Sequence, residues 1–172
     1  SDGSTVQLNT NTALSINMTD GARRLTLHRG EAFFTVAPDS NRPFEVTADH
    51  GVIRALGTAF NVRTERDQTT VTVAEHGVKI MLDSDDSVDV HEGERILYHH
   101  NRWLGPVERT NLTRTLAWQR HRLVFDNDPL PVVLDELSRY RSGRLVFLRD
   151  QSLHELLVTG SFDTDRLDRF LP

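Results

Sequence analysis

Between residues 5 and 98, apolar side chains recur at every second position, and this periodicity limits the chain to few folds. Val71 and Val73 alternate with threonines, and Val78 and Ile80 continue the pattern. A period of two residues is that of a β-strand with one buried face. Glycines interrupt the segment at irregular spacings, which disfavours a regular solenoid. The pattern predicts about ten short strands, arranged as an antiparallel sandwich, a barrel or an irregular roll.

The periodicity changes after residue 106, and we therefore expect two lobes. Residues 1–106 are predicted to form an all-β lobe and residues 107–116 a polar linker. Residues 117–172 are predicted to form a small α+β lobe, in which apolar residues recur at helical as well as strand spacing.

The second lobe is predicted to have the element order β-α-β-β-α. Residues 123–125 form its first predicted strand. Asp128 is the expected N-cap, and Pro129 the expected first residue, of a helix over 129–140. The other predicted elements are strands at 145–148 and 156–158 and a last helix over 163–170, capped by Asp163-Thr164-Asp165.

The composition excludes several classes of function. The chain has 20 Lys and Arg against 25 Asp and Glu, and without a basic stripe a nucleic-acid partner is not expected. Cysteine is absent, so disulfides and thiolate metal sites are excluded. No apolar run reaches the ~18 residues of a membrane span, and no export signal opens the chain. We therefore expect any periplasmic address to come from a preceding segment.

We expect neither an enzyme nor a metal or cofactor site. His99 and His100 are the only adjacent histidines, and neighbours in a strand point to opposite faces, so they would not chelate one ion together. Ser152 and His154 lack the sequence context of a hydrolytic nucleophile. The acidic segment 83–86 lacks the glycine and glutamate of a calcium loop.

Five sequence strings occur in order along nearly the whole chain. They are DGSTVQLN at 2–9, RGEAFFTV at 29–36, RPFEV at 42–46, ALGTAFNV at 55–62, and a distal block from AWQRHRLVFDNDPL at 117–130 to GSF at 160–162. Together they resemble periplasmic sensor-regulators of the FecR type. The resemblance implies an irregular, solenoid-like β-roll. It also implies a following lobe similar to the signalling domain at the N-terminus of secretins and TonB-dependent transporters, here with its final strand missing.

The resemblance also implies a function in cell-surface signalling. The chain would be the periplasmic receiver of a single-pass inner-membrane anti-sigma regulator. Its partner would be the N-terminal signalling domain of an outer-membrane TonB-dependent transporter for ferric siderophores. A cytoplasmic domain preceding the chain would bind an ECF sigma factor.

The small lobe is the expected contact surface, because an exposed sheet edge can accept another strand through backbone hydrogen bonds. Apolar candidates lie on two predicted strands, and charged neighbours are expected to select the partner. The candidate partner-binding residues are Arg122, Leu123, Val124, Phe125, Asp126, Arg144, Leu156, Leu157 and Val158.

Three other interpretations stay open. The Thr58 hydroxyl could attack the carbonyl of Gly57, and some FecR-type relatives are reported to cleave themselves in this way. A ligand- or carbohydrate-binding β-roll would need an aromatic cluster, and the chain has only two Trp and two Tyr. A self-assembling module would use the same open edge. Four phenylalanines are expected in the β core rather than in a ligand site, namely Phe33, Phe34, Phe44 and Phe60.

Overall fold

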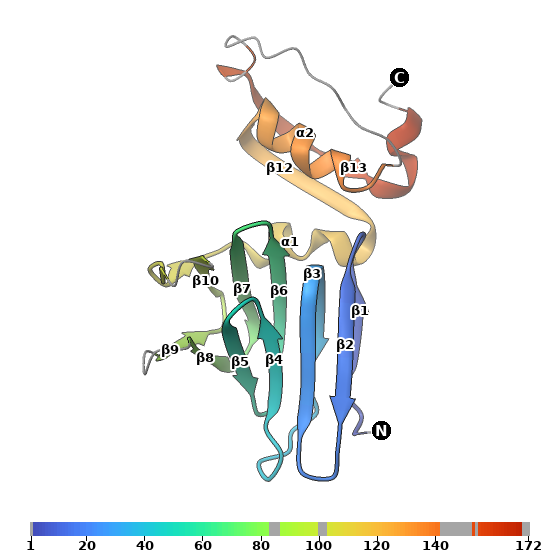
Figure 1. The fold of residues 1–172 in the computed structure, drawn as a ribbon. Helices are drawn as coiled ribbons and strands as arrows, with labels where there is room; N and C mark the ends of the chain where they lie inside the picture. Colours follow the sequence, from blue (N-terminus) through green and yellow to red (C-terminus); the bar gives the residue numbers. More distant parts are fainter. Residues whose placement is uncertain (1, 83–86, 100–102, 142–152, 154, 170–172) are drawn as a thin grey trace. The chain divides into compact units, whose positions relative to one another are not determined.

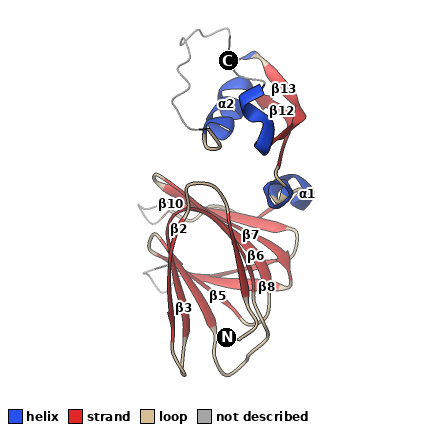
Figure 2. Ribbon diagram, turned by 90° about the vertical axis from the view of Figure 1, so that its right-hand side faces the viewer, coloured by secondary structure: helices blue, strands red, loops and turns tan. Residues whose placement is uncertain are grey.

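The structure is a computed structural model that describes residues 2–82, 87–99, 103–141, 153 and 155–169. The chain divides into two compact units, Ser1–Leu112 and Thr113–Pro172. Unit 1 is built almost entirely of strands, whereas helix α2 and strands β12 and β13 belong to unit 2 (Figures 1 and 2). Several residues of the sequence analysis lie outside the described ranges: the predicted strand at 145–148, Arg144, His100, Ser152, His154 and the segment 83–86.

The described residues of unit 1 form one curled sheet of eleven strands, which agrees with the mainly-β prediction. The strand order is β11-β10-β7-β6-β3-β4-β5-β8-β9, and β1 and β2 also pair with β3. The strands are β1 (Thr5–Leu8), β2 (Ala13–Met18), β3 (Arg23–Thr35), β4 (Phe44–Ala48), β5 (Gly51–Ala55), β6 (Ala59–Glu65), β7 (Gln68–Glu75), β8 (Gly77–Met81), β9 (Ser87–His91), β10 (Glu94–His99) and β11 (Glu108–Arg109).

Strand β3 joins the two halves of this sheet. Its first residues, 23–29, lie between β2 and β4, and its last residues, 30–35, lie between β1 and β6. Gly30 sits at the change of partners with φ +88, and a Cβ there would lie 2.5 Å from Thr12 Oγ1. Only glycine combines this backbone angle with such a close approach. The sheet therefore bends at Gly30, a position that requires glycine.

The core lies between the two halves and is filled by the inward-facing residues of the alternating pattern. Phe34 stacks on Phe60 with ring centroids 5.1 Å apart, and Phe44 meets Phe34 edge-on at 6.1 Å. All three side chains are fully buried. Burial of this apolar surface is the main term that stabilises the unit.

Phe33 is not in the core, and its expected placement there was wrong. It is half-buried, whereas its neighbour Phe34 is fully buried. In the ladder Phe33 stands opposite Gln7 and Asn61, and Phe34 opposite Val6 and Phe60. Because successive strand residues point to opposite faces, two adjacent phenylalanines cannot both face the core.

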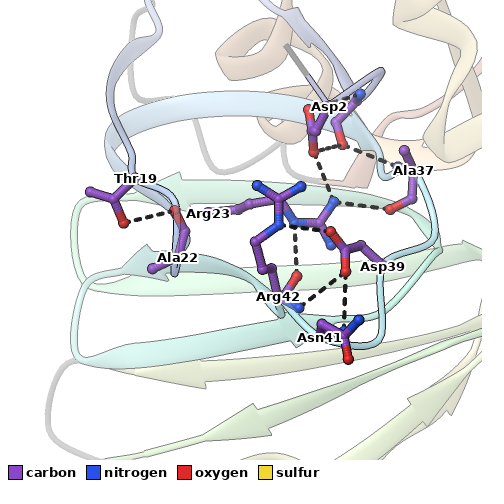
Figure 3. Close-up of polar contacts among 9 residues, drawn as sticks. Asp2, Thr19, Ala22, Arg23, Ala37, Asp39, Asn41 and Arg42 are labelled. Atoms are coloured by element: carbon purple, nitrogen blue, oxygen red, sulfur yellow. Dashed lines mark hydrogen bonds and ion pairs between the residues drawn. The ribbon is translucent and has the colours of Figure 1, made fainter.

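Strand direction also differs from the expected antiparallel arrangement at one place. Strands β3 and β4 are parallel, with Arg23 opposite Phe44 and Leu27 opposite Ala48. The connection between them, residues 36–43, lies beside the start of β3, where the carbonyls of Ala37 and Arg42 each accept a hydrogen bond from the Arg23 side chain at 2.9 Å (Figure 3). A parallel pair needs the chain to return to the end where the first strand began, whereas an antiparallel pair needs only a tight turn. Here the second part of β3, after Gly30, makes this return, because Ala37 lies beside Arg23.

Unit 2 packs helix α2 on a two-stranded antiparallel sheet, β12-β13, in the described residues. Val133 and Leu137 on one face of α2 are buried. No helix in the described residues has the length and apolar character needed to cross a membrane. The full β-α-β-β-α order stays a prediction. The elements are α1 (Leu112–Thr115), 3-10 helix η1 (Ala117–Arg120), β12 (Arg122–Pro129), α2 (Leu130–Ser138), β13 (Leu157–Asp163) and 3-10 helix η3 (Thr164–Arg169).

The predicted N-cap of α2 was wrong. Strand β12 continues through Pro129, which is itself the N-cap residue, and the helix begins at Leu130. Asp128 instead lies 2.5 Å from Arg114 and accepts a hydrogen bond from the backbone N–H of Asp126 at 2.9 Å. The carboxylate that local sequence would assign to the helix thus stabilises the bend of the preceding strand.

Candidate functional site

The β12-β13 pair of unit 2 carries most of the residues proposed for partner binding. The register places Leu123 opposite Phe162, Val124 opposite Ser161 and Pro129 opposite Leu157. Among the described residues, each strand therefore has one paired edge and one edge without a strand neighbour. This arrangement provides the geometry that strand addition requires.

The apolar residues of β12 mainly serve the core of unit 2. Leu123 and Phe125 are buried, and Phe125 packs edge-on against Phe162 with ring centroids 5.7 Å apart. Val124, on the opposite face, is half-buried. Any contact at this strand would therefore use Val124 and the backbone rather than the two buried side chains.

The apolar residues at the start of β13 are exposed. Leu156 is 52% exposed and Leu157 is 61% exposed, and Val158 is half-buried. Leu156 also fixes the local backbone, because its carbonyl oxygen accepts a hydrogen bond from the N–H of Leu130 at 2.8 Å. Of the apolar candidates, the two leucines have the greatest side-chain area available to a partner.

The described polar candidates lie at the start of β12 and at the irregularity in its middle. Arg122 is exposed and donates hydrogen bonds from Nε and Nη2 to Ser161 Oγ at 3.1 and 2.9 Å. Asp126 is exposed in an irregularity of the β12-β13 ladder, where the next residue, Asn127, has φ +52. The N–H of Asn127 donates to Thr159 Oγ1 at 3.0 Å, which holds this bulge in place. A bulge of this kind locally ends regular pairing and redirects side chains.

Gly57 and Thr58, the candidate self-cleavage pair, immediately precede β6. Gly57 has φ +144, and a Cβ there would lie 3.1 Å from Pro38 Cα, which explains the glycine. Thr58 is buried, and its Oγ1 has no hydrogen-bond partner in the described part of the chain. Its carbonyl oxygen accepts from the N–H of Val36 at 2.9 Å. The hydroxyl is thus neither solvated nor tied to another group.

Sequence analysis missed a buried arginine in unit 1. The Arg23 side chain is 1% exposed and lies over the Phe44 ring, with Cζ 5.5 Å from its centroid. Nη1 donates to Asp2 Oδ2 at 2.8 Å and to the Ala37 carbonyl at 2.9 Å, and Nε donates to the Arg42 carbonyl at 2.9 Å (Figure 3). Arg23 faces the core together with Leu25 and Leu27, because the three residues occupy alternate positions of β3. The alternating pattern could therefore have predicted that Arg23 is buried.

A second buried polar cluster surrounds Glu31. Its Oε2 accepts from Asn9 Nδ2 at 2.7 Å, and its Oε1 accepts from Asn61 Nδ2 at 2.9 Å. The Thr12 hydroxyl bonds to both the N–H and the carbonyl of Glu31 at 3.0 Å. These bonds fix the corner between β1 and β2 against β3, which indicates a structural role for a residue within the RGEAFFTV string.

The histidines are distributed rather than clustered. His50 Nε2 lies 2.8 Å from the His99 carbonyl oxygen, and its Nδ1 lies 3.1 Å from Asp49. His28 Nε2 lies 2.7 Å from Ser15 Oγ. Within the described ranges, no three His, Asp or Glu side chains are grouped as metal ligands would be.

The first unit of the chain matches a known protein family. Residues 1–79 match the family described as FecR protein. No curated protein sequence matches the chain at a significant level.

Two crystal structures of a "putative anti-sigma factor" from Parabacteroides distasonis have a similar fold. One is 24% identical and aligns over 99% of this chain and 81% of that chain, with a TM-score of 0.76. The other is 24% identical and aligns over 99% of this chain and 80% of that chain, with a TM-score of 0.75. The aligned 99% of this chain includes residues of both units, and at this identity the likeness is one of fold. The match of residues 1–79 assigns this segment of the chain to the FecR family.

Proposed function

We propose that the chain is the periplasmic receiver of a transmembrane anti-sigma regulator. In this role it binds the N-terminal signalling domain of an outer-membrane TonB-dependent transporter that takes up ferric siderophores. The signal then passes through a membrane-spanning segment to a cytoplasmic domain, which controls an ECF sigma factor. The regulator is anchored in the inner membrane by a single span, and the chain acts by binding its partner rather than as an enzyme on a substrate.

The FecR match over residues 1–79 is the observation that carries this proposal. Family membership supports a role as a signalling regulator. The fold shared with a protein described as a "putative anti-sigma factor" adds support, because the likeness covers 99% of the chain. The transporter partner is the further step of the proposal.

Unit 2 is the proposed contact surface. Its β12-β13 pair supplies strand edges, and the exposed Leu156 and Leu157 supply apolar area beside one of them. A partner strand added there would gain backbone hydrogen bonds and bury the leucines. Arg122, at the start of β12, and Asp126, in its central bulge, are exposed and would favour partners of complementary charge.

Calorimetric titration tests the proposal. The chain is titrated with purified signalling domains of TonB-dependent transporters from the same organism, and saturable binding to one of them is expected. Absence of binding to every folded signalling domain would overturn the receiver role.

Matched variants locate the contact. Leu157→Ala removes exposed apolar area at the proposed edge, and Val132→Ala removes it from α2, where Val132 is 53% exposed. The first variant should weaken binding about tenfold, equivalent to roughly 1.4 kcal/mol, and the second should leave it unchanged. Equal affinity of both variants and the parent would exclude this edge.

The carbohydrate-binding interpretation gains no support from the structure. Tyr98 and Trp118 are buried, so neither offers a face for stacking on a sugar ring. Trp103 is 50% exposed and lies against His99, with ring centroids 5.2 Å apart. The described aromatic residues therefore do not assemble into a platform.

Self-cleavage between Gly57 and Thr58 is a second candidate activity, favoured by the buried, unpaired Thr58 hydroxyl. The Thr58 Oγ1 would attack the Gly57 carbonyl carbon, the C–N bond would break, and the hydroxyl proton would pass to the freed amine. Water would then hydrolyse the resulting ester, leaving a carboxylate on Gly57 and a free amine on Thr58.

Intact mass under denaturing conditions tests this activity. Cleavage gives two fragments, residues 1–57 and 58–172, whose masses exceed that of the 19.6 kDa chain by one water in total. Thr58→Ala should abolish cleavage, whereas Thr58→Ser should retain it. A parent chain that stays at 19.6 kDa after long incubation would exclude it.

A further inference from the structure

Three arginines line one open cavity in unit 2. The cavity has a volume of about 590 Å³ and lies between η1, the start of β12, the end of β13 and η3. Arg120 of η1, Arg122 of β12 and Arg166 of η3 all line it. Its volume is within the range of pockets that hold small ligands or a few side chains.

Two of these guanidinium groups are not neutralised by a carboxylate in the described residues. Arg120 is exposed and has no hydrogen bond or ion pair within the described ranges. Arg122 donates to Ser161 Oγ, a neutral oxygen, at 2.9 and 3.1 Å. Guanidinium groups present planar arrays of N–H donors that match a carboxylate, and charge-assisted bonds of this kind are among the strongest in proteins.

The two carboxylates on the cavity wall are already engaged. Asp163 Oδ1 accepts from the N–H of Asp165 at 3.0 Å, and Asp163 Oδ2 lies 3.7 Å from Arg166 Nε. Asp165 Oδ1 lies 3.3 Å from His121 Nδ1. Three arginines against two aspartates leave one net positive charge when His121 is neutral, which suits a monoanion better than a doubly charged phosphate.

Phe162 gives the cavity an apolar part. It lines the wall between Ser161 and Asp163, and its ring packs edge-on against the buried Phe125 at 5.7 Å. A fixed ring beside cationic groups accommodates the methylene stem of an acidic side chain, while the carboxylate meets the guanidinium groups.

We propose that this cavity binds a glutamate or aspartate side chain from an acidic peptide segment of the partner. Arg120 and Arg122 bind the carboxylate, Arg166 and the two aspartates set the charge of the site, and Phe162 contacts the aliphatic stem. The cavity is a polar contact beside the β12-β13 edge and gives unit 2 a charge requirement in its partner. The identity of that partner rests on the proposed function, but the carboxylate site itself does not.

Nuclear magnetic resonance titration of the whole chain tests the site. The probes are a blocked tetraglutamate peptide, its tetraglutamine counterpart and inorganic phosphate. Tetraglutamate should shift the amide signals of residues 120–122 and 161–166 saturably, and tetraglutamine should not. Equal shifts with the two peptides would overturn the proposal. Shifts with phosphate but not with tetraglutamate would do the same.

Charge-matched variants separate the site from the general charge of the chain. Arg120→Gln and Arg122→Gln each remove a proposed donor, and Arg29→Gln removes an exposed arginine in unit 1. The first two should weaken tetraglutamate binding by about tenfold or more, and the third should not. Melting curves show whether each variant is folded. A loss as large with Arg29→Gln would mean nonspecific attraction and would overturn the site.

Titration with transporter signalling domains distinguishes this inference from the proposed function. If a domain binds the parent chain and the Arg120→Gln/Arg122→Gln double variant equally, the cavity does not contact the partner and the inference fails, while the receiver role stands. If no signalling domain binds but tetraglutamate fills the cavity, the receiver role fails and the carboxylate site stands.

Discussion

The Arg23 guanidinium and the Asp2 carboxylate form a 2.8 Å ion pair that ties the start of the chain to strand β3. Arg23 is buried, and its Nη2 has no hydrogen-bond partner in the described residues. Asp2 therefore provides the counter-charge of a cation that is removed from water. Such a pair is costly to break because the remaining charge stays buried.

Replacing Asp2 should destabilise unit 1. We expect Asp2→Ala to lower the free energy of unfolding by about 3 kcal/mol, since it leaves Arg23 without its carboxylate. Asp20→Ala, at an exposed turn, removes the same charge and should change it by less than about 0.5 kcal/mol. Chemical denaturation measures both, and equal stability of the two variants would contradict the role of the pair.

The same pair predicts a pH dependence. The Arg23 guanidinium, helped by the Ser4 hydroxyl, holds the pKa of Asp2 well below its usual range. Because the folded-state pKa lies below the unfolded value of about 3.9, the ionised carboxylate stabilises the fold above that pH, and this contribution falls as the pH drops towards the folded-state pKa. The stability difference between the parent and Asp2→Ala should be constant from roughly pH 5 to pH 8 and shrink below about pH 4. A difference independent of pH down to about pH 2 would contradict this assignment.

Two phenylalanines test the placement of the core. Phe60→Ala removes a fully buried ring stacked on Phe34 and should cost about 3–5 kcal/mol. Phe33→Ala removes a half-buried ring on the other face of β3 and should cost about 1 kcal/mol. Thermal melts of both variants measure the difference. A Phe33 variant as unstable as the Phe60 variant would mean that the outer face is also a core.

Gly30 and Gly21 test the bend of β3. Gly30→Ala forces a Cβ to 2.5 Å from Thr12 Oγ1 at φ +88, and we expect a loss of at least about 2 kcal/mol. At Gly21 an added Cβ meets no atom within 4 Å, so Gly21→Ala should be within about 0.5 kcal/mol of the parent. Denaturant midpoints compare the two, and a tolerated Gly30→Ala would show that the bend does not depend on this residue.

Tyr98 should titrate abnormally. Its hydroxyl donates to the Ala48 carbonyl at 2.9 Å, and burial raises its pKa above the ordinary value. The neutral phenol stabilises the fold below the unfolded pKa of about 10, and this stabilisation is lost as the pH rises further. Ultraviolet titration should show Tyr98 ionising only well above about pH 10 or on unfolding. Tyr98→Phe should remove the late transition and cost about 1–2 kcal/mol.

Alternation predicted best those strands of unit 1 that have a single buried face, namely β4, β5, β8 and β10. Val71 and Val73, and Val78 and Ile80, are buried as their phase requires. Alternation carries no information on strand direction, so the parallel β3-β4 pair was beyond its reach. That direction depends on the return of β3 after Gly30, which brings Ala37 beside Arg23 and which alternation does not specify.

Polar residues were harder to place than apolar ones. Asp128 satisfies the local rule for an N-cap. In the fold, however, its carboxylate accepts a hydrogen bond from Arg114, fourteen residues earlier, and does not cap the helix. Glu31 is buried because Asn9 and Asn61 come from two other parts of the chain to bond it. Such partners are brought together by the tertiary fold, and single-sequence patterns describe only neighbours. The cavity lined by Arg120, Arg122 and Arg166 was not predicted either, because its residues come from segments that only the tertiary fold brings together.

The continuity of β3 has a mechanical consequence. One strand carries hydrogen bonds to β1 and β6 in its second part and to β2 and β4 in its first. Asp2, at the start of the chain, is pinned to the first residue of that strand, Arg23. Tension applied at the N-terminal end of the chain would therefore load the strand common to both halves before it reached any edge. Through the Asp2–Arg23 ion pair, a force on the N-terminal end acts on the central strand of the sheet.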